Sequence, residues 1–150
     1  MALFGAPITH EDHVRRALLA ALAVQRVLAG GGEKADRETL DLPVRIGIHT
    51  GPVVFGPVAD RLPMDYTVIG DTANIAARLQ ALAKPGTICI SQTVYEQVKN
   101  KLNFRYHPLG SHRVKNIVEP VRAYAVEVAA TARRRRRRRW PLVAATGGLQ

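Results

Sequence analysis

Asn74 and Arg78 are the residues of this chain whose types and spacing could do chemistry. They lie four positions apart, so on a helix they would be neighbours on one side. An amide donor beside a planar guanidinium suits a phosphate group, or negative charge that develops during phosphoryl transfer. On spacing alone, the simpler interpretation is a solvated helix arginine next to an indifferent asparagine. The surrounding sequence has to decide between these two interpretations.

A strand–turn–helix pattern positions the pair. Tyr66–Ile69 is aromatic and β-branched, which favours a strand. Gly70 breaks this strand, and Asp71 or Thr72 is expected to cap the helix that follows. An apolar stripe then recurs at helical spacing, at Ile75, Leu79 and Leu82. The two polar residues flank this stripe, where their side chains can reach a cleft or a partner.

The net charge of +10 is concentrated near one end of the chain. Seven positive charges form the uninterrupted block Arg133–Arg139, and removing them leaves +3. This remainder is ordinary for a globular domain, so the charge does not indicate specific nucleic-acid binding. We expect residues 129–150 to form a disordered, arginine-rich tail. Trp140 and the apolar residues after it are typical of the cytoplasmic flank of a membrane segment; a salt-sensitive contact with an anionic surface is the alternative.

The composition indicates one domain of a cytoplasmic protein. A chain of 150 residues with 47% hydrophobic side chains can bury a core. No apolar run is long enough to span a membrane, and no signal-peptide pattern opens the sequence. The single cysteine, Cys89, lies between two isoleucines and is expected to be a buried, inert strand residue.

The first part of the chain predicts a strand followed by a helix. Met1–Ile8 is apolar and has the pattern of a short strand. Thr9 is expected to cap a helix that runs to about Ala29. His10 and His13 stand close to two acidic residues, but no further ligands follow at the usual spacing, so capping is preferred to a metal site.

Strands alternate with helices in the rest of the chain. Val44–Val58 predicts strands interrupted at glycines. Within it, His49 is expected to be packed or hydrogen-bonded rather than a general base, because no nucleophile pattern accompanies it. Thr87–Ser91 predicts a buried strand, and Ser91 or Thr93 is expected to cap the next helix.

Two further strands close the predicted fold. They are expected at Phe104–Pro108 and Val121–Val128. Arg113 and Lys115 lie in the connection between them and are side chains of the kind that surrounds phosphates. This order of elements favours an α/β fold with a mixed sheet.

Three motifs occur together and in order. They are V-R-I-G-I-H-T-G, Y-T-V-I-G-D-T-A-N-I-A-A-R-L and L-G-S-H-R-V-K-N-I-V-E-P-V. Over roughly Met1–Glu127 the chain closely resembles the catalytic domain of class III adenylate/guanylate cyclases. The resemblance implies an α+β sandwich with the ferredoxin-like cyclase fold. It also implies that residues 1–128 are a partial catalytic domain that lacks the first strand and first helices of that fold.

The resemblance assigns roles to four residues. Asn74 would orient the ribose, and Arg78 would stabilise charge on the α-phosphate in the transition state. Lys115 matches a lysine that binds the terminal phosphates. Thr67 matches the base-selecting position, which favours ATP over GTP. Asn116 stands where the family usually has glycine.

The resemblance also implies what this chain would need from elsewhere. Cyclase sites form between two catalytic domains and use Mg or Mn ions, so a homodimer or a second cyclase domain is the expected partner. The family's metal-binding aspartates precede the segment that Met1–Ile8 resembles, and no aspartate here matches them. We therefore expect a fragment of a cyclase that makes cyclic AMP, in preference to cyclic GMP, and pyrophosphate for intracellular signalling. Alone it is expected to be inactive and to fold poorly or associate; the alternative is a degenerate regulatory or dimerisation domain.

Overall fold

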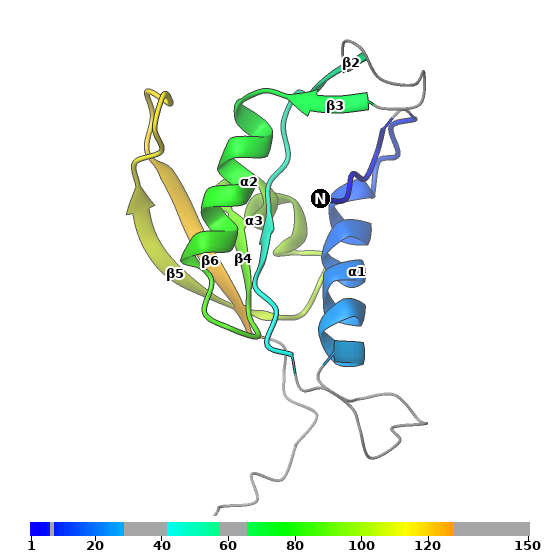
Figure 1. Ribbon diagram of the computed structural model, residues 1–150. Helices are drawn as coiled ribbons and strands as arrows, with labels where there is room; N and C mark the ends of the chain where they lie inside the picture. Colours follow the sequence, from blue (N-terminus) through cyan, green and yellow to red (C-terminus); the bar gives the residue numbers. More distant parts are fainter. Residues whose placement is uncertain (7, 29–41, 58–65, 128–150) are drawn as a thin grey trace, which may run out of the picture.

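A four-stranded mixed sheet forms the centre of the computed structural model, which describes residues 1–6, 8–28, 42–57 and 66–127 (Figure 1). The strand order is β1-β4-β6-β5. β1 pairs with β4 in parallel, and the other two pairings are antiparallel. The mixed sheet predicted from the sequence is therefore confirmed. The strands are β1 (Ile46–Ile48), β4 (Ile88–Ser91), β5 (Arg105–His112) and β6 (Val121–Glu127).

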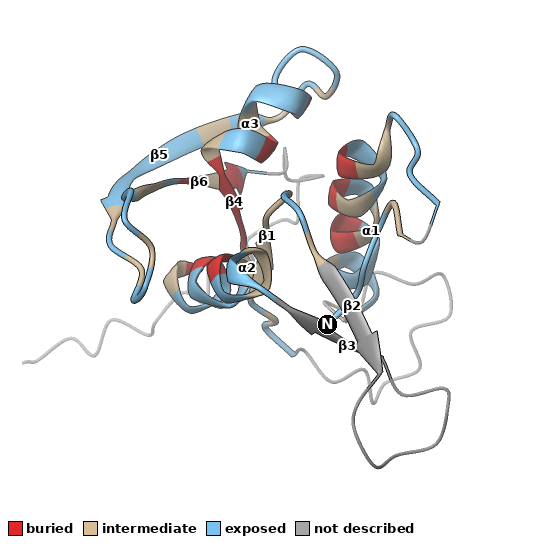
Figure 2. Ribbon diagram, turned by 90° about the horizontal axis from the view of Figure 1, so that it is seen from above, coloured by how far each residue is buried: buried red, intermediate tan, exposed pale blue. Residues whose placement is uncertain are grey.

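Helices cover both faces of this sheet (Figure 2). α1 (His13–Leu28) and α3 (Gln92–Val98) pack on one face, and α2 (Asp71–Leu82) packs on the other. Alternate residues of β4 serve the two layers: Ile88 and Ile90 join the cluster with α1 and α3, whereas Cys89 joins the cluster with α2. A strand that is covered on both faces has a continuous run of apolar residues in its sequence. This is why the short run around Cys89 is wholly buried, as expected.

A separate two-stranded antiparallel sheet leads into α2. It consists of β2 (Val54–Pro57) and β3 (Tyr66–Ile69), with Gly56 opposite Thr67. β3 confirms the strand predicted from its aromatic and β-branched residues. Only Gly70 separates β3 from α2, and its φ of 142° lies in a region that side-chain-bearing residues rarely adopt.

The cap of α2 differs from the sequence prediction. Gly70 occupies the N-cap position, and no side chain accepts a hydrogen bond there. The Thr72 hydroxyl instead donates to the carbonyl oxygen of Pro52 at 2.6 Å. Asp71 lies in the first turn, where its charge favours the positive end of the helix dipole. The prediction that Asp71 or Thr72 caps this helix was wrong, because a tertiary partner engages the threonine. Ser91 does cap α3, by accepting from the N–H of Val94.

The N-terminal segment also differs from its prediction. Within residues 1–6 and 8 there is no strand, because an extended segment gains ladder hydrogen bonds only when another strand pairs with it. α1 begins at His13 rather than next to Thr9, and the Thr9 hydroxyl donates to the carbonyl oxygen of Gly5 at 3.3 Å. The predicted Thr9 cap was therefore wrong.

β5 is longer than predicted. The sequence indicated a strand that ends at Pro108, but β5 continues to His112 past a register shift between Pro108 and Gly110. Pro108 has no N–H to donate, and β5 is an edge strand, where proline is tolerated. Within the described residues, no helix is both long and apolar enough to cross a lipid bilayer. The predicted tail, residues 129–150, lies outside the described residues.

Candidate functional site

α2 holds Asn74 and Arg78 on the side of the helix that flanks the core. Each residue directly precedes a core anchor: Ile75 is 9% exposed and Leu79 is 1% exposed. Successive helical residues are rotated by about 100°, so both polar side chains lie beside the buried stripe and are exposed. Burying two large aliphatic side chains contributes about 1.5–3 kcal/mol each. The orientation of the polar pair is therefore fixed by packing.

A tight turn after β5 presents Lys115. The N–H of Ile117 donates to the carbonyl oxygen of Val114 at 3.1 Å, which closes a four-residue turn with Lys115 and Asn116 at its centre. Asn116 has a φ of 67°, a left-handed conformation that asparagine tolerates better than most residues. Asparagine therefore fits the position where the resemblance led us to expect glycine. Ile117 packs against the core cluster under α2, which fixes the turn.

The turn and α2 meet at a pocket of about 600 Å³. In Figures 1 and 2 the connection between β5 and β6 extends beside α2. Three of the four predicted site residues line this pocket: Asn74, Arg78 and Lys115. Thr67 lies on β3, but its side chain is outside the described part of the structure. The remaining lining residues are Ala77, Ala81, Arg113, Val114 and Asn116.

The pocket is suited to an anion. Its charged lining residues are Arg78, Arg113 and Lys115, and among the residues that the structure describes no carboxylate lines it. The side-chain ion pairs found among the described residues join Arg15 to Asp12 and His107 to Glu127, so they neutralise none of the three cations. Guanidinium and ammonium groups make charge-assisted hydrogen bonds to phosphate oxygens. The sequence indicated Arg113, together with Lys115, as a side chain of the kind that surrounds phosphates, but the family resemblance assigned no role to Arg113.

The pocket does not fit a divalent metal ion. Mg²⁺ is bound through carboxylates and water, whereas the lining offers amide oxygens among three positive charges. Over the described ranges, no group of three or more histidine, cysteine or acidic side chains is placed to hold a metal. The Mg or Mn ions expected from the resemblance therefore have no fitting donor set in this pocket.

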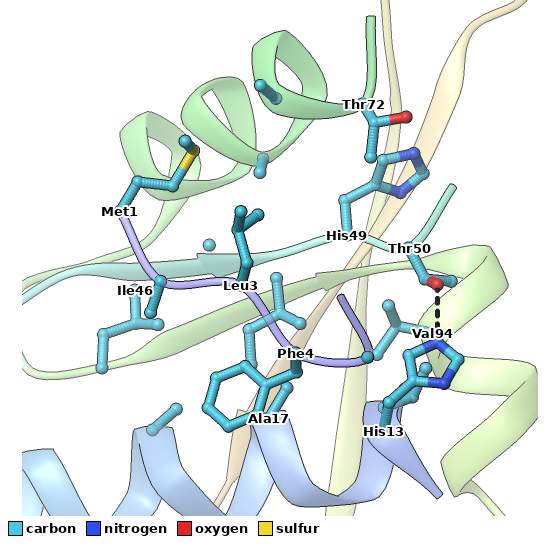
Figure 3. Close-up of a pocket in the computed structure, with 18 of the residues that line it drawn as sticks. Met1, Leu3, Phe4, His13, Ala17, Ile46, His49, Thr50, Thr72 and Val94 are labelled. Carbon is cyan, nitrogen blue, oxygen red and sulfur yellow. Dashed lines mark hydrogen bonds between the residues drawn. The ribbon is translucent and has the colours of Figure 1, made fainter. Parts of the chain in front are cut away.

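A larger cavity lies elsewhere and is mainly apolar (Figure 3). It encloses about 1020 Å³ between α1, β1, α2 and the segment Met1–Ala6. β1 is the edge strand along this groove. The groove contains no cluster of cations, so the smaller polar pocket is the better candidate for phosphate chemistry despite its size.

Hydrogen bonding accounts for the histidines beside this groove. His49 Nδ1 lies 2.8 Å from Ser91 Oγ, and burial lowers the pKa of His49. His13 Nδ1 is 2.7 Å from the carbonyl oxygen of His10, and its Nε2 is 3.4 Å from Thr50 Oγ1. A hydrogen-bonded His49 confirms that part of the sequence interpretation. His13 thus joins the start of α1 to the segment after β1, and His49 joins that segment to the end of β4.

Comparison with known proteins agrees with the fold and the motifs. The family described as "Adenylate and Guanylate cyclase catalytic domain" matches residues 1–128. Adenylate cyclase 1 of Rhizobium meliloti (strain 1021) is 34% identical over 87% of this chain and 21% of its own length. Guanylate cyclase soluble subunit beta-2 of Rattus norvegicus is 34% identical over 67% of this chain and 14% of its own length.

A solved structure shows the same architecture. The guanylate cyclase domain of RhGC from Catenaria anguillulae, crystallised in complex with GTP, superposes with a TM-score of 0.66. The two chains are 32% identical, and the match covers 83% of this chain and 65% of the crystallised domain. The chain thus spans about a fifth or less of the two curated relatives and about two thirds of the crystallised domain. With its fold, its three motifs and its polar pocket, the chain belongs to the adenylate and guanylate cyclase catalytic domain family.

Proposed function

We propose that this chain supplies the phosphate-and-ribose half of a nucleotidyl cyclase site. The reaction converts a nucleoside triphosphate into a 3′,5′-cyclic nucleotide and pyrophosphate. One observation carries the proposal: Asn74, Arg78 and Lys115, which come from two separate motifs, line a single pocket to which the described residues contribute no carboxylate. Such a pocket complements a polyphosphate and repels a free metal ion.

Each polar side chain has a step that suits its chemistry. The attack of the ribose 3′-hydroxyl on the α-phosphate places negative charge on phosphate oxygens. The Arg78 guanidinium stabilises that charge, and it is always protonated. The amide of Asn74 orients the ribose so that the 3′-oxygen stands in line with the leaving pyrophosphate. The ammonium of Lys115 binds the terminal phosphates, which leave as pyrophosphate.

ATP is the proposed substrate in preference to GTP. Thr67 stands at the position that matches base selection in the family, on the strand that leads into α2. A threonine hydroxyl can both donate and accept a hydrogen bond. The matched relatives include an adenylate cyclase and a guanylate cyclase, so direct comparison of the two nucleotides in one assay is required.

A second cyclase domain completes the site in this proposal. The reaction needs carboxylate ligands for Mg or Mn, and the residues that line the pocket do not provide them. These ligands would come from the partner across a dimer interface, which is a homodimer or a pairing with another cyclase domain. The pocket is open to a partner, since Asn74, Arg78 and Lys115 are all exposed.

Complementation tests this proposal. The full chain is mixed with a class III cyclase domain that retains its metal carboxylates but has its own equivalents of Asn74 and Arg78 replaced by alanine. We expect cyclic AMP from manganese and ATP in the mixture and none from either protein alone. Arg78→Ala in this chain should lower the restored rate by about 10²–10³-fold, as for other lost transition-state donors.

A matched control keeps the result interpretable. Arg122 is exposed on β6 between Val121 and Ala123, which pack toward α2, so its side chain faces the other side of the sheet. Arg122→Gln should leave the restored rate unchanged. Equal rates for Arg78→Ala and the unsubstituted chain would disprove the proposed role of the pocket. A mixed complex that forms but stays inactive would favour the regulatory or dimerisation alternative.

The basic block Arg133–Arg139 suggests where the protein acts. We propose that it holds the domain on the cytoplasmic side of a membrane through an anionic lipid surface, each nearby arginine contributing about 1 kcal/mol. Binding to vesicles rich in phosphatidylserine, lost at high salt and absent with phosphatidylcholine, is the expected result. Salt-independent binding to both vesicle types would contradict it.

A further inference from the structure

Arg113 is the one charged residue of the candidate pocket to which no motif gives a role. We propose that Arg113 is a further substrate-binding residue, which binds the terminal phosphates of the nucleoside triphosphate together with Lys115. This inference rests on the proposed function, because it names a further contact at that same site. The inference adds Arg113 to the proposed substrate contacts. It predicts that the chain binds polyphosphate, which can be measured in the absence of any reaction.

Arg113 and Lys115 lie two residues apart in the connection after β5. They flank Val114, which is half-buried, whereas both charged residues are exposed. Both side chains line the pocket, Arg113 from the segment after β5 and Lys115 from the turn that follows. The left-handed turn at Asn116 then reverses the chain, so the two cations remain at the pocket wall that faces α2.

No structural role among the described residues accounts for Arg113. Its side chain makes no hydrogen bond or ion pair with them, and it is exposed. Three cations around one pocket repel each other unless an anion lies between them. In the part of the chain that the structure describes, no carboxylate lines the pocket to relieve this repulsion. An anion bound between the three cations would relieve this repulsion.

The shape of the pocket favours a polyphosphate over a small anion. Ala77 and Ala81, four residues apart on α2, also line the pocket. Their side chains are single methyl groups, and the pocket has a volume of about 600 Å³. An α-phosphate near Arg78 places the terminal phosphates toward Arg113 and Lys115. A guanidinium and an ammonium side by side can bind oxygens of both terminal phosphates.

Calorimetry with inorganic tripolyphosphate tests the inference on the full chain. We expect Arg113→Gln to weaken tripolyphosphate binding about tenfold, since a hydrogen bond between charged groups is lost. Arg113→Lys should retain part of the affinity because it keeps the charge. Two control variants remove the same unit charge elsewhere: Arg122→Gln on the opposite sheet face and Arg136→Gln in the basic block. Each control should change the affinity less than twofold, which separates the loss of a pocket contact from the loss of one positive charge elsewhere.

The outcomes separate this inference from the proposed reaction. If Arg113→Gln and the two controls weaken binding equally, or if the unsubstituted chain does not bind tripolyphosphate, the inference is wrong. In the complementation assay, Arg113→Gln should raise KM for the nucleotide about tenfold with kcat nearly unchanged. Specific loss of tripolyphosphate binding without any cyclic nucleotide would support the inference while the proposed reaction fails. Restored activity that Arg113→Gln leaves intact would support the reaction and overturn the inference.

Discussion

Gly47 of β1 lies so close to Ala76 of α2 that no side chain fits between them. A Cβ atom added at Gly47 would stand 2.3 Å from the carbonyl oxygen of Ala76 and 2.3 Å from the backbone nitrogen of Gln80. The helix that carries Asn74 and Arg78 therefore rests directly on the sheet. This contact sets how far the two polar side chains stand from the turn at Lys115, which is joined to the same sheet through β5 and β6.

Gly47→Ala should destabilise the protein strongly. Both atoms that the new methyl group meets belong to the backbone of α2, so they cannot move aside as a side-chain end can. Overpacking of this kind costs about 1–3 kcal/mol or more, measured as the free energy of unfolding in urea. Gly51→Ala is the comparison variant and should cost less, because its nearest neighbour is the side-chain oxygen of Thr72 at 2.8 Å; it disturbs the hydrogen bond from Thr72 to Pro52 but not the backbone of α2. Equal losses for the two variants would contradict the close approach.

The turn at Asn116 predicts an unusual ranking of substitutions. Asn116→Gly should keep the fold, since glycine adopts a φ of 67° without strain. Asn116→Val should cost about 1–3 kcal/mol, because a β-branched residue is strained in the left-handed region. The free energy of unfolding measures the strain. The affinity for tripolyphosphate shows whether the valine variant also displaces the neighbouring Lys115. A valine variant as stable as the glycine variant would disprove the turn geometry.

Burial of His49 predicts a loss of stability in mild acid. Burial lowers its pKa in the folded state, so the unfolded chain takes up a proton more readily. The stability contributed by neutral His49 is complete above the unfolded pKa of about 6.5 and is lost as the pH falls through the folded pKa. His49→Gln should reduce the slope of unfolding free energy against pH below about 6.5. Parallel pH profiles for the two proteins would show that His49 is not responsible.

Cys89 should be unreactive in the native protein. Its side chain is 0% exposed, and burial raises the pKa of the thiol to about 11. Because the thiolate is the reactive form, labelling by a thiol reagent at pH 8 should be at least about a hundredfold slower than in urea. Cys89 is the single cysteine of the chain, so Cys89→Ala gives the blank. Rapid labelling of the native protein would contradict its place in the sheet.

Local signals predicted much of the fold. The apolar run around Cys89 indicated a buried strand, and the β-branched run before Gly70 indicated another; the structure contains both. Ser91 caps its helix as predicted, because its acceptor is an N–H only three residues away. Such features depend on neighbours in the sequence, which is why they could be inferred without tertiary contacts.

Predictions that depended on distant partners were less accurate. Thr72 does not cap α2, because its hydroxyl binds Pro52 across the fold. Met1–Ile8 has the composition of a strand, but its described residues pair with no strand. β5 extends beyond Pro108 because β6 continues to pair with it as far as His112. Composition indicates which conformation a segment prefers. Whether the segment adopts it depends on the hydrogen-bonding partners that the tertiary structure provides.

For the candidate site, too, some features could be predicted from the sequence and others depended on the tertiary structure. The sequence by itself determined the family motifs and the spacing of Asn74 and Arg78, because four residues on a helix give one fixed geometry. Only the tertiary structure brought α2 and the turn at Lys115 to one pocket and added Arg113 to its wall. The physical reason is the pairing of β4 with β6 and the contact of α2 with the sheet at Gly47. These long-range contacts carry no signal in the local pattern of residues.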